Sequence, residues 1–176
     1  MSRSKYSLIV IWIAVLAVLL VPRMVKEEPA VNGCALLEVT DGDTLRVVYK
    51  GETVSVRLIG VDAPESVHPT ESKNSEAGEK AHAYMIALTD GMERLYLEFD
   101  REQYDGYGRM LAYVYLAEDA SFTESINYRL VAEGYAVNKE YKPNTRYAGY
   151  LKRACDEAKS SQRGLWAEKE IQKVWN

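Results

Sequence analysis

The chain has 176 residues, of which 47% are hydrophobic and 27% charged, a composition typical of one globular domain with an N-terminal appendage. Its formal net charge is −4, and the part after residue 28 has 18 basic and 24 acidic residues. Because non-specific affinity for nucleic acid comes largely from lysine and arginine, this balance argues against tight binding of that kind and leaves phosphate recognition to a local cluster.

The N-terminal region predicts a membrane anchor or an export signal. Arg3 and Lys5 precede residues 6–22, an uncharged stretch of mostly Leu, Ile, Val and Ala. Its 17 residues are at the short limit for a spanning helix and exceed most signal-peptide cores, and no small-x-small cleavage site follows directly. A retained anchor over residues 1–22 is favoured over a cleaved signal peptide. Either one places the domain outside the cytoplasm, membrane-anchored or secreted.

Beyond this segment, residues 23–33 are interpreted as a linker and residues 34–176 as the folded domain. Three strands are predicted at its start, over residues 35–39, 45–49 and 53–59, the last two from alternating apolar residues. The turn Lys50-Gly51 joins the second and third strands into a hairpin. Two more strands are expected over residues 95–99 and 110–116.

Three helices are predicted between and after these strands. The first covers residues 76–88 with Ser75 as its N-cap, the second contains Ile126 and ends at Gly134, and the third covers residues 146–161. Five short strands, a helix between the third and fourth, and helices at the end are typical of an α+β OB-fold, a five-stranded β-barrel with about three α-helices.

The cysteines and histidines give weaker indications. Cys34 and Cys155 can form one disulfide in an oxidising compartment or remain two separate thiols, and the sequence leaves both open. His68 and His82 stand apart from the acidic motifs, so a zinc site is not expected.

Acidic residues mark the two strand ends that the hairpin brings together. Asp43 precedes the second strand, and Asp62 and Glu65 follow the third. Each could be a turn residue on its own, but three carboxylates on one point need a neutralising cation, and a hard cation such as Ca²⁺ seeks several oxygen ligands. An EF-hand loop is rejected, because Arg46 occupies the position where that loop requires glycine.

Two arginines belong to the same region. Arg57 lies on the third strand, on the face that it shares with Ser55 and Ile59. Arg109 follows a glycine-rich turn at the start of the fifth strand. Two guanidinium groups beside a metal suit a phosphodiester, since each can bind two phosphate oxygens. Glu65 is then the candidate for positioning or deprotonating a water molecule.

Four segments together resemble one known family. They are residues 39–44, with Asp41-Gly42-Asp43-Thr44; residues 57–65, ending in Asp62-Ala63-Pro64-Glu65; residues 105–114, with Tyr107-Gly108-Arg109; and Tyr141-Lys142-Pro143-Asn144. In this order and spacing they resemble the staphylococcal nuclease family over about residues 36–166.

The resemblance implies an OB-fold nuclease that cleaves DNA and RNA with Ca²⁺ and leaves 3′-phosphorylated products. It implies metal ligation by Asp43, Asp62 and the backbone carbonyl of Ala63, with Asp41 ordering water nearby. It assigns Glu65 to the attacking water. Binding of the scissile phosphate falls to Arg57 and Arg109, and contact with the nucleotide to Tyr107 and Tyr141. A monomer is expected.

The chain departs from the family pattern at three positions. Ala63 replaces a hydroxyl residue, Gly106 occupies a place that can hold lysine, and Lys139 one that can hold tyrosine. The acidic balance also predicts weaker substrate binding and a smaller salt dependence than in a basic enzyme.

Two other functions are alternatives to the nuclease, a non-catalytic OB-type nucleic-acid-binding module and a calcium-dependent adhesion or scaffold domain. A decayed nuclease site would have lost at least one of its acids or arginines. All are present here, namely Asp43, Asp62, Glu65, Arg57 and Arg109. The enzyme is therefore the preferred interpretation.

Overall fold

The computed structural model describes residues 32–66, 75–169, 171 and 175. In this part of the chain the strands are β1 (Asn32–Asp41), β2 (Thr44–Tyr49), β3 (Glu52–Leu58), β4 (Val61–Asp62), β5 (Arg94–Glu98), β6 (Met110–Tyr115) and β7 (Val137–Asn138). The α-helices are α2 (Glu76–Thr89), α3 (Ile126–Ala132) and α4 (Ala148–Ser160), and the short 3₁₀ helices are η2 (Phe122–Glu124) and η3 (Gly164–Ala167).

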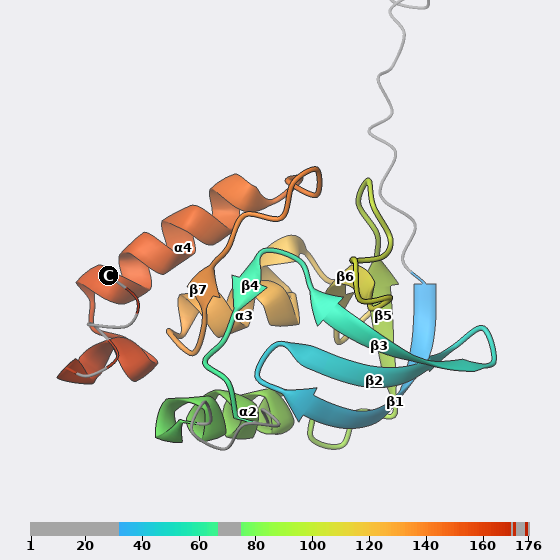
Figure 1. Cartoon of the computed structure of the whole chain (residues 1–176), viewed down its shortest axis with the longest axis horizontal. Helices are drawn as coiled ribbons and strands as arrows, with labels where there is room; N and C mark the ends of the chain where they lie inside the picture. The colour runs from blue at the N-terminus through green and yellow to red at the C-terminus, as the bar shows by residue number, and fades with distance from the viewer. Residues whose placement is uncertain (1–31, 67–74, 170, 172–174, 176) are drawn as a thin grey trace, which may run out of the picture.

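Five strands close into a barrel in the order β1-β2-β3-β6-β5 (Figure 1). β1 closes it, because residues 32–35 pair with β5 and residues 35–41 pair with β2. The strand pairs are antiparallel except β3 and β6, which run parallel. This mixed barrel with three α-helices fits the predicted α+β class and OB-type architecture.

The predicted hairpin of β2 and β3 is confirmed. Its turn residues Lys50 and Gly51 have φ angles of 52° and 86°, the left-handed conformation that a two-residue hairpin turn needs. The register pairs Thr44 with Arg57 at the other end of the hairpin. Asp43, which immediately precedes Thr44, therefore lies beside Arg57, as the sequence predicted.

Helix α2 begins where the sequence predicted and fixes the segment that carries Glu65. The Ser75 hydroxyl accepts a hydrogen bond from the Gly78 N–H at 3.0 Å, so Ser75 is the N-cap. The Ser75 N–H in turn donates to the Glu65 carbonyl at 3.1 Å. A Cβ atom on Gly78 would lie 2.1 Å from that carbonyl oxygen, so the close approach requires glycine.

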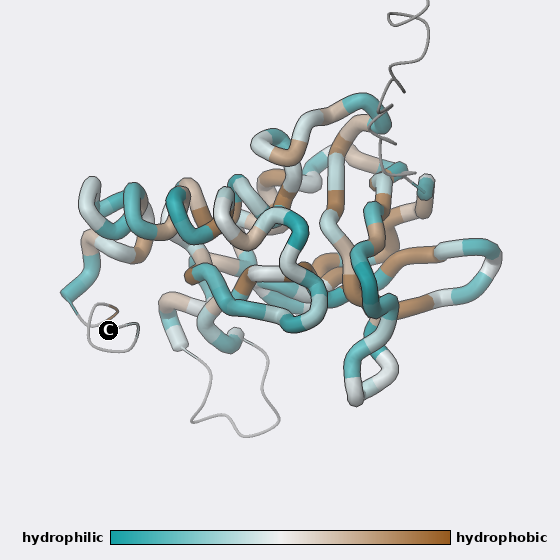
Figure 2. The backbone as a smooth tube through the Cα atoms, turned by 90° about the horizontal axis from the view of Figure 1, so that it is seen from above, coloured by the Kyte–Doolittle hydropathy of each residue, from teal (hydrophilic) through white to brown (hydrophobic). Residues whose placement is uncertain are grey.

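Helices α3 and α4 cover the barrel next to β4 and β7 (Figure 1). Asn127 of α3 is fully buried; its amide donates to the carbonyl of Ile59 at 2.9 Å and accepts from the N–H of Val114 at 2.9 Å. α4 buries a stripe at helical spacing that includes Leu151 and Ala158, and Figure 2 shows apolar residues recurring along it between hydrophilic ones. The two helices thus hold the segment between β3 and β4.

A buried acidic residue ties the end of β5 to the loop before α4. Glu98 is 1% exposed, and its carboxylate accepts hydrogen bonds from the Tyr115 hydroxyl, from Arg146, and from the Tyr147 hydroxyl at 3.1 Å. A buried carboxylate is stable only when it is paired and hydrogen-bonded in this way. The cluster was not predicted from the sequence.

The short sheet of β4 and β7 was also not predicted. Asp62 pairs with Val137 and Val61 with Asn138, in antiparallel register. The next residue after β7, Lys139, donates its backbone N–H to the Gly60 carbonyl at 3.1 Å. This pairing places residues that are far apart in the sequence beside the end of the hairpin.

Several predictions concern residues at the edges of the described region. The anchor or signal segment over residues 1–22 and His68 lie outside the described residues. β1 begins at Asn32, so two residues assigned to the linker belong to the barrel. Across the described ranges, no helix combines the length and the hydropathy of a membrane span.

Burial and contacts define the surroundings of the cysteines, of His82 and of two tryptophans. Cys34 and Cys155 are free thiols, so of the two alternatives the structure has separate thiols and no disulfide between them. His82 lies on α2, with Nε2 3.1 Å from the Val39 carbonyl oxygen. Trp166 is 2% exposed and packs against Trp175, with ring centroids 4.9 Å apart, so both tryptophans belong to the packing of the C-terminal end.

Candidate active site

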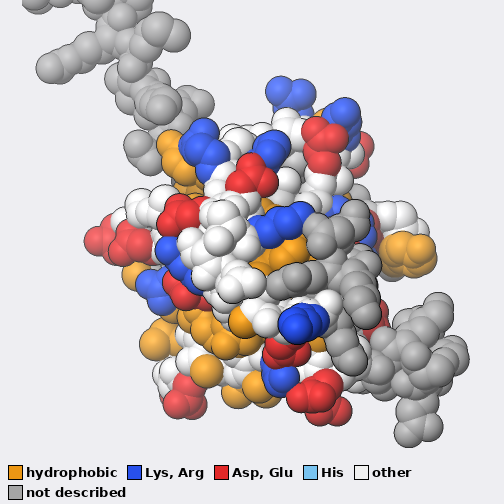
Figure 3. Space-filling model, turned by 90° about the vertical axis from the view of Figure 1, so that its left-hand side faces the viewer, with side chains coloured by type: hydrophobic (Ala, Val, Ile, Leu, Met, Phe, Trp, Pro, Cys, Tyr) orange, Lys and Arg blue, Asp and Glu red, His pale blue; other side chains and the backbone are white. Residues whose placement is uncertain are grey.

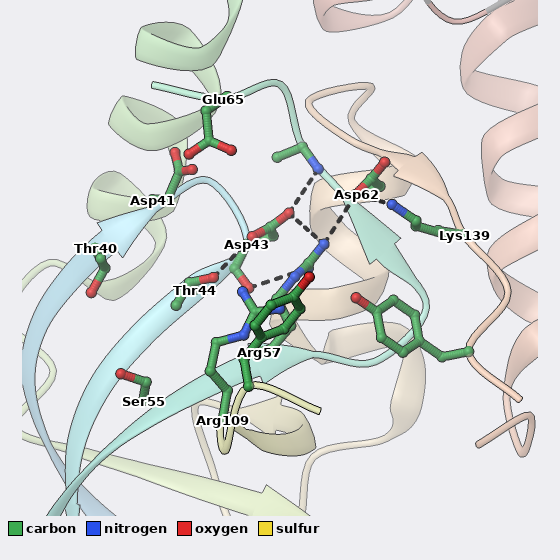
Figure 4. A pocket seen from close by; sticks show the side chains of 13 residues that line it. Thr40, Asp41, Asp43, Thr44, Ser55, Arg57, Asp62, Glu65, Arg109 and Lys139 are labelled. Atoms are coloured by element: carbon green, nitrogen blue, oxygen red, sulfur yellow. Dashed lines mark hydrogen bonds and ion pairs between the residues drawn. The ribbon is translucent and has the colours of Figure 1, made fainter. Parts of the chain in front are cut away.

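A pocket of about 520 Å³ opens at the end of the hairpin (Figure 4). β1 to β3, the segment after β4, the turn before β6 and the segment after β7 all contribute to its lining. The lining residues are Thr40, Asp41, Asp43, Thr44, Ser55, Arg57, Asp62, Ala63, Glu65, Tyr107, Arg109, Lys139 and Tyr141. Every site residue predicted from the sequence therefore faces one pocket, together with Thr40, Thr44, Ser55 and Lys139, to which no role was assigned.

Arg57 forms the centre of the pocket. Its Nη2 atom lies 2.8 Å from Oδ2 of Asp43 and 3.0 Å from Oδ1 of Asp62, and Figure 4 shows it between the two carboxylates. Its Nη1 atom donates to the Val61 carbonyl at 2.8 Å and to the Leu58 carbonyl at 3.4 Å. The side chain is 5% exposed, so the guanidinium is held rigidly at the base of the pocket.

Asp43 is the more buried of the two carboxylates. Its Oδ2 accepts the Ala63 N–H at 3.0 Å, and its Oδ1 accepts the Thr44 hydroxyl at 3.0 Å. Burial raises the pKa of Asp43, and the charge of Arg57 with these two hydrogen bonds opposes the rise. Asp43 thereby joins the end of β1 to the segment that follows β4.

Glu65 lies beside Asp41 rather than beside Asp43 and Asp62. Figure 4 shows the carboxyl groups of Glu65 and Asp41 turned toward each other. Asp41 is fixed by the Gly42 N–H at 2.8 Å and by the hydroxyl of Ser66. Burial, together with the hydrogen bond and the charge of Asp41, raises the pKa of Glu65. A carboxyl group whose pKa is raised is a stronger proton acceptor once it is ionised.

Arg109 is held by the turn that precedes it. Oδ1 of Asp105 accepts the backbone N–H groups of Tyr107 and Arg109, each at 2.9 Å, and Oδ2 accepts Nε of Arg109 at 2.7 Å. Burial would raise the pKa of Asp105, but these hydrogen bonds from Arg109 and Tyr107 outweigh it and lower the pKa. The guanidinium carbon of Arg109 lies 5.6 Å from the centre of the Tyr107 ring.

The two predicted nucleotide-contacting tyrosines stand at the pocket on separate loops. The side chain of Tyr107 is 89% exposed, and that of Tyr141 is half-buried, with its ring centre 5.7 Å from the guanidinium carbon of Arg57. The two loops are joined by Asn144, which is 3% exposed and exchanges hydrogen bonds with the main chain of Glu102 at 2.8 and 2.9 Å. Each ring thus lies next to an arginine side chain.

Lys139 adds a contact that the sequence did not indicate. Its Nζ atom lies 2.9 Å from Oδ1 of Asp62, the same oxygen that Arg57 contacts. The sequence marked Lys139 only as a departure from the family pattern. No periodic signal accompanies the two-residue strands that bring it to Asp62, a residue 77 positions earlier.

The acidic side chains do not form a metal-binding cluster by themselves. Within residues 32–66 and 75–169, no three Asp, Glu, His or Cys side chains lie close enough together to hold a metal ion by themselves. The expectation that Asp43, Asp62 and Glu65 meet at one point is therefore corrected. Arg57 lies between the carboxylates of Asp43 and Asp62, and the carboxyl group of Glu65 faces that of Asp41.

The donor set still fits a divalent cation. The pocket is lined by four carboxylates and three basic side chains, and one of the basic ones, Arg109, is already paired with Asp105 outside the lining. The carboxyl groups of the lining therefore outnumber its basic groups, as expected for a cation site. Asp43 and Asp62 with the adjacent Ala63 carbonyl would supply hard oxygen donors of the kind Ca²⁺ binds.

Charged side chains on one other face of the molecule are mixed in sign. Figure 3 shows acidic and basic side chains interspersed on the face that includes the C-terminal helices, without a continuous basic area. This mixture agrees with the acidic balance of the domain.

Comparison with known proteins gives matches over most of the chain. The family described as staphylococcal nuclease homologue matches residues 55–168. A thermonuclease of Staphylococcus intermedius is 38% identical over 143 residues, which are 80% of this chain and 81% of that protein. A thermonuclease of Staphylococcus hyicus is 34% identical over 132 residues, 75% of this chain and 74% of that protein. Endonuclease YncB of Bacillus subtilis is 33% identical over 145 residues, 81% and 65% respectively.

Proposed function

Because the chain belongs to the staphylococcal nuclease family, we propose that it is a nuclease, a hydrolase that cleaves phosphodiester bonds in nucleic acid. We propose further that it depends on Ca²⁺, that it acts on both DNA and RNA, and that its products carry 3′-phosphates. One observation supports this more than any other. The pocket combines a rigid arginine between two carboxylates with a second arginine and a separate glutamate.

The two arginines bind the scissile phosphate in this proposal. Arg57 is already oriented by main-chain carbonyl groups, so little conformational entropy is lost when it binds a phosphate oxygen. Arg109 is held from one side through its Nε atom, which leaves its two Nη groups for the substrate. Both charges stabilise the negative charge that increases on the phosphoryl oxygens in the transition state.

Glu65 accepts the proton of the attacking water. The water oxygen bonds to phosphorus while the bond from phosphorus to the 5′ oxygen breaks. The 5′ oxygen takes up a proton from solvent, so the products are a 3′-phosphate and a 5′-hydroxyl. The raised pKa of Glu65 supports this role, because a general base is most effective when its pKa approaches the working pH. Asp41 contributes to the raised pKa, because its hydrogen bond and its negative charge both favour the protonated form of Glu65.

Asp43, Asp62 and the carbonyl oxygen of Ala63 would hold the Ca²⁺ ion. When bound, Ca²⁺ supplies positive charge that stabilises the developing charge on the phosphoryl oxygens. Tyr107 and Tyr141 contact the nucleotide, and the neighbouring arginines orient their rings.

We also propose that the domain acts outside the cytoplasm, anchored to a membrane or secreted. The uncharged stretch over residues 6–22 supports this location. Both locations suit an enzyme that meets extracellular or incoming nucleic acid.

The nuclease proposal is tested with the full-length chain. We expect it to degrade single-stranded DNA and RNA in millimolar Ca²⁺, to stop when EDTA is added, and to resume when Ca²⁺ is restored. Gel analysis of labelled substrates measures the cleavage, and mass spectrometry of the products identifies the phosphate at the 3′ end.

Three results would count against this proposal. Cleavage that continues in EDTA would contradict the dependence on Ca²⁺. Products with 5′-phosphates would show that the bond from phosphorus to the 5′ oxygen is not the one that breaks. Binding of nucleic acid without any cleavage would favour the non-catalytic OB-type module instead.

A further inference from the structure

Lys139 stands at the pocket on a fixed backbone with a movable side chain. Its backbone N–H donates to the Gly60 carbonyl at 3.1 Å, directly after β7 pairs with β4. Its side chain is 51% exposed and reaches Oδ1 of Asp62 at 2.9 Å, and Figure 4 shows it approaching Asp62 from the side opposite Asp43. The ammonium group can therefore leave Asp62 without any change in the backbone.

The two cations on Asp62 differ in how firmly they are held. Arg57 is 5% exposed and donates to main-chain carbonyl groups as well as to the carboxylates. Lys139 contacts Asp62 from solvent, and an exposed ion pair of this kind contributes at most about 1 kcal/mol. Lys139 is thus the group that is displaced from Asp62 when another cation binds there.

We propose that Lys139 alternates between two partners, Asp62 in the free protein and a phosphate group of the nucleic acid in the loaded one. This rests on the proposed function, in which Asp62 holds the metal. In the free protein Lys139 competes with Ca²⁺ for the Asp62 carboxylate and lowers the affinity for the ion. Once the ion is bound, the displaced ammonium group lies at the rim of the pocket as a phosphate-binding group.

The proposal accounts for how an acidic domain collects an anionic substrate. The ammonium group of Lys139 becomes available to a phosphate only when Asp62 binds the metal ion instead. Since a lysine ammonium is a compact charge on a flexible stem, it can follow a phosphate whose position varies with the substrate.

The test is Lys139→Met, which removes the charge and keeps much of the length of the side chain. We expect calorimetry to show Ca²⁺ binding about fivefold tighter without nucleotide, because the competing ion pair is gone. In saturating Ca²⁺, we expect binding of a nucleoside 3′,5′-bisphosphate to be about fivefold weaker, because a phosphate contact is lost.

Lys142→Met is the matched control. Lys142 lies in the same segment, is 76% exposed, pairs with Glu140 and does not line the pocket. This variant removes the same charge from the protein, so both affinities should stay within about twofold of wild type.

The two shifts must occur together and in opposite directions. If Lys139→Met alters only one affinity, alters both in the same direction, or matches Lys142→Met, the alternation is overturned. When the wild type still cleaves nucleic acid in Ca²⁺, such a result leaves the nuclease function intact. A wild type that binds neither Ca²⁺ nor the nucleotide overturns the nuclease function and the role of Lys139 together.

Discussion

Replacing Glu65 with glutamine is expected to lower kcat by about 10²- to 10⁴-fold, while Ca²⁺-dependent binding of nucleotide stays near the wild-type value. Glutamine cannot accept the proton of the attacking water. The nearest charged partner of Glu65 is Asp41, so the ion pairs of Arg57 with Asp43 and Asp62 should remain intact. Single-turnover cleavage of a labelled oligonucleotide and calorimetric binding of a nucleoside 3′,5′-bisphosphate measure the two quantities separately.

Glu52→Gln is the control for this variant. Glu52 is an exposed glutamate at the start of β3, whereas Arg57 lies near the other end of that strand. Its replacement removes the same charge and should leave kcat unchanged. An equal loss of turnover and of nucleotide binding in Glu65→Gln would make Glu65 a ligand or a structural residue instead of a base.

Replacing Arg109 with alanine is expected to lower kcat/KM by about 10²- to 10³-fold, the usual effect of removing one donor from a charged transition state. The fold should tolerate the change. Oδ1 of Asp105 still accepts the backbone N–H groups of residues 107 and 109, so the turn keeps its shape without the guanidinium. Steady-state cleavage with a thermal melt of each variant measures both effects.

Arg101→Ala separates a local effect of Arg109 from a general loss of charge. Arg101 is exposed, lies in the same connection between β5 and β6, and does not line the pocket. We expect it to cleave at the wild-type rate at moderate salt. If Arg109→Ala cleaves at a rate close to that of the wild type, Arg109 does not bind the scissile phosphate.

The hairpin could be predicted because its information is local. Alternating apolar residues and the Lys50-Gly51 turn lie within one short stretch, and the register that they set places Asp43 beside Arg57. The environment of Arg57 could not be predicted in the same way. Strand alternation assigned it to a face, but its 5% exposure also depends on the Val61 carbonyl, which reaches it only after the chain turns at Gly60.

The partners of the acidic residues depended on contacts that the sequence does not encode locally. Glu65 was expected beside Asp62, yet the approach of α2, which requires Gly78, fixes its segment near Asp41. The contact of Lys139 with Asp62 depends on a sheet of two-residue strands, which are too short for any periodic signal. These long-range contacts are features of the pocket that the short family motifs do not contain.

The most direct test of the central claim, that the pocket holds a metal against a phosphate, is the coupling between the two ligands. Calorimetry would measure the Ca²⁺ affinity of the full-length chain with and without a nucleoside 3′,5′-bisphosphate, and then the nucleotide affinity with and without Ca²⁺. We expect each ligand to tighten the other by the same factor, of about 10 or more, as reciprocal coupling within one site requires. Affinities that are independent of each other would contradict the claim.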